Sequence, residues 1–328
     1  MWFNLLSQKT FPIGVEITAK FVRMAQLGLS DGQIKLIAGG SEPLPEGIEP
    51  YSGQWQRSTI EAVRSIYSSA PFKSKNVITV MPCADMFSKE IKKKLGSRQA
   101  AEDVLGAEVK KLLPFESQGA LVRHIVLSQD DESAEEKDIL ILAAEKFKVE
   151  RHLAIFEKAS LNVRAITVWP VILVNSYVNF FGRRKTDFDA VVMLINASET
   201  ECNVIICRQH DILFARTIPC GIGSLGQSKG IEKLVSQIEA CIRYFQATDR
   251  TSAIERILLF ASEGAEKNLI ECILTVAKKH TMPAHVGDVL KPVANNDLFS
   301  RGIDARVVRD DWTTAFGLSL SYEKGLGI

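Results

Sequence analysis

The sequence predicts an α/β fold of two lobes, each made of a three-stranded β-meander followed by alternating helices and strands. Two observations lead to this prediction. The same order of apolar strands, tight turns and amphipathic helices occurs twice along the chain, and an inserted segment, residues 86–145, interrupts only the first copy. A duplicated half of this kind gives a two-lobed molecule with a cleft between its lobes, and such clefts commonly hold a ligand.

The first copy opens with strands predicted over residues 13–18, 21–27 and 33–38. Asp31-Gly32, between the second and third strands, is a dipeptide typical of a two-residue hairpin. The spacing of apolar residues predicts the elements that follow. They are a helix over 55–69, a strand over 76–81, a helix over 146–160 and a strand over 163–168.

The second copy repeats the meander with strands predicted over residues 191–196, 202–208 and 212–218. The helix predicted over 230–248 carries its apolar residues on one face, as expected for a helix that packs on a sheet. The remaining elements are a strand over 256–261, a helix over 265–279, a strand over 284–286 and a final helix over 312–322. We therefore place lobe I at residues 1–185 and lobe II at residues 186–328, and leave open whether the final helix returns to lobe I.

The inserted segment has the order strand, helix, strand, strand. Its predicted elements are a strand over 86–91, a helix over 99–113, a strand over 120–127 and a strand over 138–144. The acidic loop at residues 130–136 is too charged to be buried. These elements are enough for a small subdomain with its own core.

Composition excludes several classes of protein. A chain of 328 residues has room for two domains. Its formal net charge of +1 gives no global field that favours a nucleic acid or a membrane surface, and no apolar run reaches the roughly 20 residues that span a bilayer. The six cysteines lack metal-ligand spacing and fit a reducing cytoplasm. The basic runs Lys92–Lys94 and Arg183–Lys185 indicate a solvated face, with contact to anionic lipid headgroups as the alternative.

Short segments along nearly the whole chain share the order and spacing of one known family. They are Gly14 to Ile17, Glu108 to Phe115, Leu142 to Lys146, Phe214 to Pro219, Tyr244-Phe245 and Ala315 to Leu320. Together they resemble the PilM family of type IV pilus assembly, with relatives in type II secretion, within the actin-like (ribonuclease H-like) superfamily. The inserted subdomain also resembles that of the division protein FtsA. FtsA ends in an amphipathic membrane-targeting helix, and we expect none after residues 324–328 of this chain.

The resemblance implies where a nucleotide would bind. Actin-like enzymes place an acidic residue at the end of the first strand of each lobe to hold magnesium and its waters through oxygen. Small residues follow, so that backbone N–H groups of the turn can approach the phosphates. In lobe I the matching positions are Glu16, Thr18, Ala19 and Lys20, and Glu16 is the metal-ligand candidate. In lobe II they are Asn196, Ser198, Glu199, Gly221, Gly223 and Gly264.

Several of these positions depart from the family pattern. Leu194 stands where lobe II should carry its acidic residue and offers no oxygen, Thr18 replaces a glycine, and Glu199 would repel phosphates. We expect Gly221 and Gly223 to form a flexible turn that needs positive φ. We therefore expect a degenerate cleft that binds ATP and magnesium weakly or not at all, and we assign no catalytic residue. An active ATPase whose nucleotide state controls partner binding remains the alternative.

The resemblance also implies a partner. PilM-like proteins capture the cytoplasmic tail of a PilN-like inner-membrane protein in a groove between the first lobe and the inserted subdomain. We expect that groove near Phe87, Val104, Lys111 and Leu112. The chain would then be a cytoplasmic scaffold at the inner face of the inner membrane, held there through its partner alone. Self-association stays open, and we expect no nucleic-acid partner.

Overall fold

The computed structural model describes residues 9–94, 109, 111–116, 119–127, 136–249, 252–261, 267–293, 298–303 and 311–321. The chain divides into two compact units. Unit 1 comprises Met1–Cys83, Phe147–Ser176 and Asp288–Ile328, and unit 2 comprises Ala84–Lys146 and Tyr177–Gly287. This grouping differs from the predicted lobes in three places. The inserted segment and residues 177–185 group with unit 2, and residues 288–328 group with unit 1.

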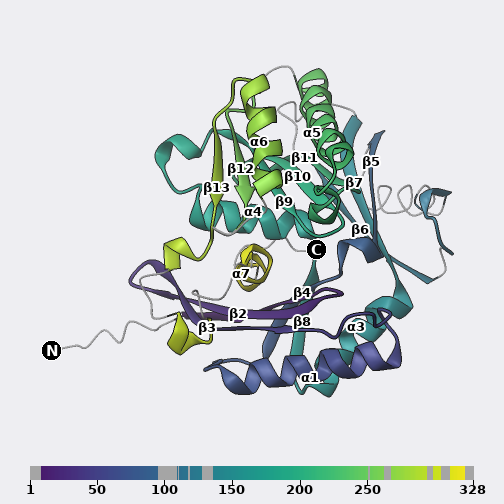
Figure 1. Cartoon of the computed structure of the whole chain (residues 1–328), viewed down its shortest axis with the longest axis vertical. Coiled ribbons are helices and arrows are strands. Elements are labelled where there is room, and N and C mark those ends of the chain that lie inside the picture. The colour runs from purple at the N-terminus through teal and green to yellow at the C-terminus, as the bar shows by residue number, and fades with distance from the viewer. Residues whose placement is uncertain are drawn as a thin grey trace. The chain divides into compact units, whose positions relative to one another are not determined.

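Unit 1 contains a five-stranded sheet with the strand order β3-β2-β1-β4-β8 (Figure 1). Its strands are β1 (Lys9–Ile17), β2 (Phe21–Ser30), β3 (Gln33–Pro43), β4 (Asn76–Val80) and β8 (Asn162–Thr167). The first three form an antiparallel meander, and β4 and β8 run parallel to β1. The predicted hairpin is present: Asp31 and Gly32 have φ values of 53° and 72°, as a two-residue turn of this type requires.

Helices cover both faces of this sheet. Helix α1 (Gly53–Ser69) and helix α3 (Lys146–Lys158) bury their apolar faces in one core with alternate residues of β1 and β2. Helix α7 (Thr313–Leu320) packs on the opposite face, against β1 and β2. Ser319 fixes this packing, because its hydroxyl donates to the Pro12 carbonyl at 2.7 Å and accepts from the Leu27 N–H at 3.1 Å.

Gly14 makes the close approach of α7 possible. A Cβ at this position would overlap the carbonyl oxygen of Ala315 and would lie 2.6 Å from the backbone nitrogen of Ser319. Both neighbouring atoms belong to the backbone and cannot rotate away. Glycine is therefore required here by packing rather than by backbone conformation.

A buried histidine lies under the same sheet. The Thr79 hydroxyl donates its only proton to the Val15 carbonyl at 2.9 Å, so Nε2 of His152, at 2.9 Å from the same oxygen, must carry a hydrogen and donate it. His152 is fully buried, and burial lowers its pKa to about 4. The ring is therefore neutral at physiological pH.

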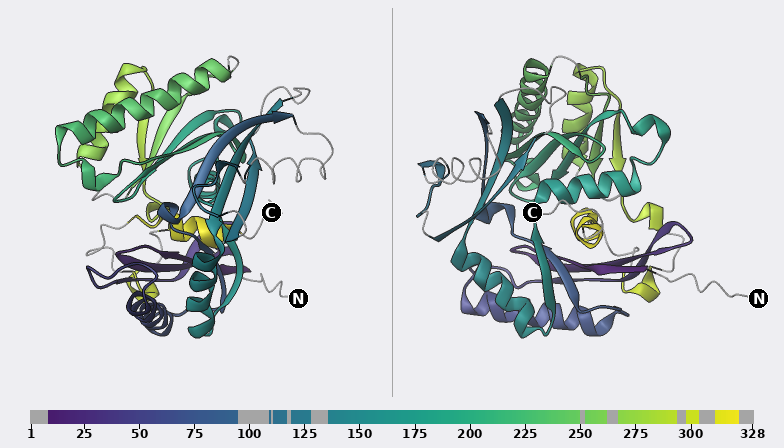
Figure 2. Two further views of the ribbon diagram at one scale, coloured as in Figure 1. Left: turned by 90° about the vertical axis from the view of Figure 1, so that its right-hand side faces the viewer. Right: turned by 180° about the vertical axis from the view of Figure 1, so that it is seen from behind.

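Unit 2 repeats the topology of unit 1. Its five-stranded sheet has the order β11-β10-β9-β12-β13, made of β9 (Val191–Ala197), β10 (Cys202–Arg208), β11 (Asp211–Ile218), β12 (Arg256–Phe260) and β13 (Ala284–Gly287). Helices α5 (Ser228–Thr248) and α6 (Lys267–Lys279) lie side by side on one face, as Figure 2 shows, and bury their apolar residues in a single core with the sheet. The predicted duplication of a meander followed by parallel strands is confirmed.

The inserted segment forms a second sheet in unit 2, with the order β5-β7-β6. Its strands are β5 (Met86–Lys94), β6 (Ala120–Val126) and β7 (Glu136–Glu145), all antiparallel. Val109, Ile139 and Ile141 form its core, against which Leu112 packs. Most of the predicted helix over 99–113 and the acidic loop lie outside the described residues.

One long helix was not predicted. Helix α4 (Trp169–Phe180) is apolar around most of its circumference, so no single-face pattern indicated it. Short 3₁₀ turns complete the description: Cys83–Asp85, Lys185–Asp187, Ile222–Ser224, Lys291–Val293 and Phe299–Arg301. Among the described helices, none is long and apolar enough to cross a membrane.

Candidate functional site

The first predicted phosphate turn, between β1 and β2, is closed by its own threonine. Thr18 Oγ1 accepts hydrogen bonds from the backbone N–H groups of Lys20 and Phe21, at 3.2 and 3.1 Å. The Thr18 N–H in turn donates to the Phe21 carbonyl at 2.9 Å. The side chain that replaces glycine therefore uses the N–H groups that a phosphate-binding turn would present. Ala19 and Lys20 are exposed at its tip.

Glu16, the predicted metal ligand, pairs with an arginine. Arg23 Nη1 lies 3.3 Å from Glu16 Oε2 and donates to the Asp311 carbonyl at 2.7 Å. The Arg23 guanidinium also lies over the rings of Phe21 and Trp312, at 4.1 and 5.2 Å from their centroids. Its side chain is 4% exposed and that of Glu16 is 16% exposed. The guanidinium is thus held on several sides in a fixed position.

The pKa of Glu16 is raised to about 7, mainly because the carboxyl is buried. The negative charge of Asp311 raises it further, whereas Arg23 and a hydrogen bond from Thr314 lower it. Arg23 therefore compensates only part of the cost of burying this carboxylate.

In unit 2, the predicted turns pack against each other. The Ser198 carbonyl accepts from the Ile222 N–H at 2.8 Å, and the Glu199 carbonyl accepts from the Gly223 N–H at 2.9 Å. A Cβ on Gly221 would lie 2.5 Å from the Ser198 carbonyl oxygen, and one on Gly223 would lie 2.7 Å from Glu199 Oε1. Neither glycine has a positive φ, so the prediction that this turn needs positive φ at Gly221 and Gly223 was wrong. Both are glycines because the two turns approach closely.

The remaining nucleotide candidates are not brought into one described site. Leu194 is fully buried in β9, the central strand of its sheet. Asn196 is half-buried near the end of β9, opposite Asn203. Gly264 lies outside the described residues.

Two of the partner-groove candidates, Phe87 and Leu112, lie on the core side of the three-stranded sheet. Directly opposed residues of antiparallel strands share a face, so Phe87, four residues before Ile91, lies on the side of Ile139 and the core. Leu112 packs against that core, and Lys111 beside it is exposed. Val104 lies outside the described residues.

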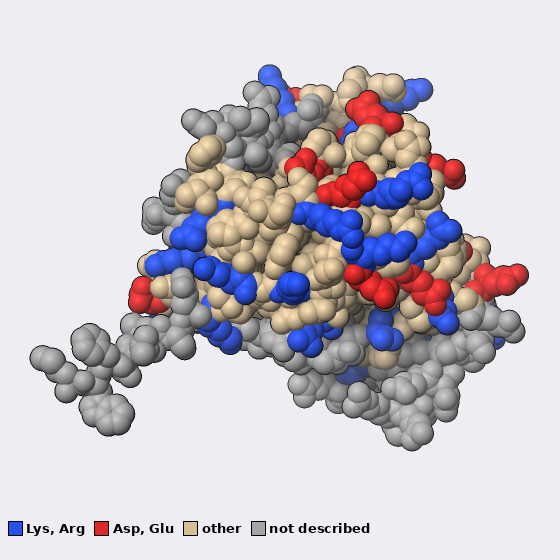
Figure 3. All heavy atoms as spheres, turned by 90° about the horizontal axis from the view of Figure 1, so that it is seen from below, with Lys and Arg blue, Asp and Glu red and all other residues tan. Residues whose placement is uncertain are grey.

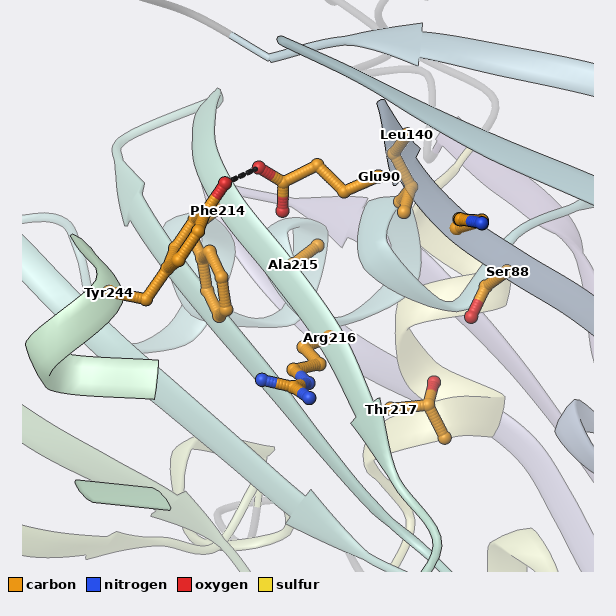
Figure 4. Close-up of a pocket in the computed structure, with 9 residues that line it drawn as sticks. Ser88, Glu90, Leu140, Phe214, Ala215, Arg216, Thr217 and Tyr244 are labelled. Carbon is orange, nitrogen blue, oxygen red and sulfur yellow. Dashed lines mark hydrogen bonds between the residues drawn. The ribbon is translucent and has the colours of Figure 1, made fainter. Parts of the chain in front are cut away.

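The opposite face of this sheet borders a cavity that the sequence did not reveal (Figure 4). Its volume is about 430 Å³. It is bounded by β5, β7, β11 and α5, through Ser88, Lys89, Glu90, Leu140, Phe214, Ala215, Arg216, Thr217 and Tyr244. All of these residues belong to unit 2.

A hydrogen bond crosses the cavity. The Tyr244 hydroxyl, on α5, donates to Glu90 Oε1, on β5, at 3.0 Å. Burial raises the pKa of Glu90, with a further contribution from Asp138, while Tyr244, Arg216 and Lys92 lower it. Burial also raises the pKa of Tyr244 to about 12, so the phenol keeps its proton and remains a donor. Sequence patterns gave no sign of this pair, because its members are 154 residues apart.

The rest of the described chain offers little other chemistry. No group of three or more His, Cys, Asp and Glu side chains among the described residues is placed to hold a metal ion. Burial raises the pKa of the Cys202 and Cys241 thiols, which makes them poor nucleophiles.

Figure 3 shows Lys and Arg side chains in a band across one face, with Asp and Glu side chains beside them. That face carries both signs of charge rather than a single-sign patch.

Two sheets of the same mixed topology, each a meander extended by parallel strands, define an actin-like fold. The family model described as "Type IV pilus assembly protein PilM" matches residues 14–228. This match covers more than half of the chain, and the chain belongs to this family.

Two solved structures with TM-scores above 0.5 agree with this fold. The chain is similar to one titled "PilM-PilN type IV pilus biogenesis complex", with 14% identity, a TM-score of 0.74 and coverage of 94% of this chain and 97% of that one. A protein of Bacteroides thetaiotaomicron with an actin-like ATPase fold and unknown function is 10% identical, with a TM-score of 0.51 and coverage of 90% and 100%. The cytoplasmic domain of EpsL, an inner-membrane component of type II secretion in Vibrio cholerae, is 14% identical, with a TM-score of 0.47 and coverage of 89% and 96%.

Proposed function

We propose that this chain is a cytoplasmic scaffold of a type IV pilus or related type II secretion platform, and that it binds the cytoplasmic tail of a PilN-like inner-membrane protein. The match to the PilM family carries this proposal. The similarity to a chain of a PilM–PilN structure, which extends over nearly the full length of this chain and of the matched chain, supports it. Binding to a membrane protein would place the chain at the inner face of the inner membrane without a membrane span of its own.

We place the tail beside the core of the inserted sheet. Phe87 is a half-buried aromatic side chain on an edge strand, and exposed Lys111 lies next to Leu112, which packs on the core. A peptide lying on this face gains affinity from the apolar side chains that it buries against Phe87 and Leu112.

The test uses a synthetic peptide with the cytoplasmic tail of the PilN-like protein encoded beside this chain, measured by calorimetry. We expect binding that weakens about tenfold or more in Phe87→Ala, because buried aromatic anchors dominate such interfaces. Lys111→Glu should also weaken it. Phe188→Ala and Lys278→Glu are the matched controls, since both side chains are exposed elsewhere in unit 2. A peptide that does not bind the unaltered protein would contradict the proposal.

We propose further that the nucleotide cleft is degenerate. Three observations support this. Thr18 uses N–H groups of the first turn, Glu16 is paired with a fixed guanidinium, and Leu194 provides no oxygen in the second half. The residues present do not fit magnesium and a triphosphate, because a hard cation needs several oxygen ligands.

Calorimetry with ATP and magnesium separates this proposal from the active-ATPase alternative. We expect no binding stronger than about 1 mM, which corresponds to roughly 4 kcal/mol, and the same result for Glu16→Ala. Tight binding that disappears both with EDTA and in Glu16→Ala would favour the ATPase. The same samples, run on a sizing column with light scattering, test for self-association.

A further inference from the structure

The cavity between β5 and β11 is lined by two strand edges. Among the described strands, β5 and β11 are each the last in the order of their sheets, so each has one paired side. Their nearest Cα atoms come within 8 Å of each other. An edge strand presents unpaired N–H and C=O groups, which favour the addition of another strand.

The charged groups of the cavity suit the main chain of a peptide. Glu90 supplies carboxylate oxygens, which accept hydrogen bonds from N–H groups, and Arg216 supplies a guanidinium, which donates to carbonyl oxygens. The two are close enough for the charge of Arg216 to lower the pKa of Glu90. Their opposite charges complement the dipole of a peptide amide. A ligand that carries charge of a single sign would be attracted by one of the two groups and repelled by the other.

The other lining groups suit extended backbone as well. Ser88 and Thr217 add hydroxyl groups that donate and accept, and Figure 4 shows them beside the cavity on β5 and β11. Phe214 and Leu140, which are 3% and 2% exposed, form an apolar floor for alternate side chains. Tyr244 holds the Glu90 carboxylate from α5 and is thus a positioning residue.

We propose that this cavity is a second peptide site, which binds an extended, uncharged polypeptide segment through its main chain. It is independent of the groove at Phe87 and Leu112, because it lies on the opposite face of the three-stranded sheet. The partner is a protein with an exposed strand-forming segment. Recognition depends on the backbone of that segment more than on its side chains.

The test measures fluorescence anisotropy of a labelled Thr-Val-Thr-Val-Thr-Val peptide amide with the full chain. We expect saturable binding that alternate N-methylation of the peptide weakens about tenfold or more, because main-chain hydrogen bonds are lost. Glu90→Gln and Arg216→Gln should each weaken it several-fold, and Tyr244→Phe less. Arg183→Gln, which removes an exposed guanidinium elsewhere in unit 2, should leave it unchanged. Urea midpoints measured for each variant confirm that it is folded.

Other outcomes would overturn the proposal. Absence of binding, or equal binding of the N-methylated peptide, would exclude strand addition. A peptide with a central Glu that binds more tightly would identify a carboxylate site instead. Binding that is lost in Phe87→Ala but kept in Arg216→Gln would assign the peptide to the groove at Phe87 and Leu112 instead. Failure of the PilN-like tail to bind would count against that groove alone and would leave the cavity at Glu90 and Arg216 unaffected.

Discussion

Replacing Gly14 with alanine is expected to destabilise unit 1 by about 4 kcal/mol, from overpacking and from lost hydrogen bonds. The added Cβ would overlap the Ala315 carbonyl oxygen, so α7 must move away from β1. This movement also breaks both hydrogen bonds of the Ser319 hydroxyl, to the Pro12 carbonyl and from the Leu27 N–H. The result should be a lower urea midpoint, measured by circular dichroism at pH 7.

Gly53→Ala is the matched control. Gly53 opens α1 in the same unit, and an added Cβ there would meet only the end of the Arg57 side chain, at 3.9 Å. Alanine in place of glycine at such a position usually leaves stability unchanged or raises it slightly. An unchanged urea midpoint for Gly14→Ala would mean that α7 contributes little to the stability of unit 1.

The stability of the protein should depend on pH through the buried His152. His152 has a pKa of about 4 in the folded protein against an ordinary value of 6.5. The unfolded chain therefore binds the proton first, and lowering the pH from 6.5 to 4 favours unfolding. The loss is about 3 kcal/mol, since each pKa unit corresponds to about 1.4 kcal/mol. Protonated His152 would carry a buried charge whose Nδ1 hydrogen has no acceptor among the described residues.

Glu16 acts in the opposite direction. Its folded pKa of about 7 lies above the ordinary value of 4.5, so its contribution is fully present below pH 4.5 and is lost as the pH rises through 7. Between pH 4.5 and 6.5 the two slopes nearly cancel. We therefore expect a flat stability profile from this pair in the unaltered protein.

Replacing Glu16 should reveal the slope that His152 contributes. In Glu16→Gln, the urea midpoint should fall more steeply from pH 7 to pH 4 than in the unaltered protein, because the opposing slope of Glu16 is removed. The double variant Glu16→Gln, His152→Gln should remove that fall, since glutamine keeps a donor for Thr79 without titrating in this range. A Glu16→Gln profile as flat as that of the unaltered protein would contradict the low pKa of His152.

Local sequence signals predicted most of the fold. The Asp31-Gly32 turn, the strand alternation and the one-faced helix over 230–248 each depend on neighbours in the sequence, so they can be recognised without the structure. Helix α4 was missed because apolar residues around its circumference give no one-sided period. The three-stranded meander occurs twice along the chain, so the duplication could also be recognised from the sequence.

The candidate sites were less accessible to prediction. Thr18 and Leu194 could be recognised in the sequence as departures from a family pattern. The sequence could not show that the Thr18 hydroxyl accepts hydrogen bonds from backbone N–H groups of its turn, or that Arg23 pairs with Glu16. The sequence suggested that Gly221 and Gly223 are glycines because the turn needs positive φ. The structure shows instead that the turn at Ser198 and Glu199 comes too close to leave room for a Cβ. Glu90, Arg216 and Tyr244 meet only through tertiary packing, which no local pattern encodes.

The bond between Ser319 and Pro12 joins residues that are 307 positions apart. A ribosome adds residues from the N-terminus onward, so the first strand leaves the exit tunnel long before its covering helix exists. The face of β1 around Gly14 must stay uncovered while the whole of unit 2 is synthesised. Nascent chains that stall before residue 313 would lack the helix that covers this face, and transiently exposed apolar surface of this kind is prone to aggregation.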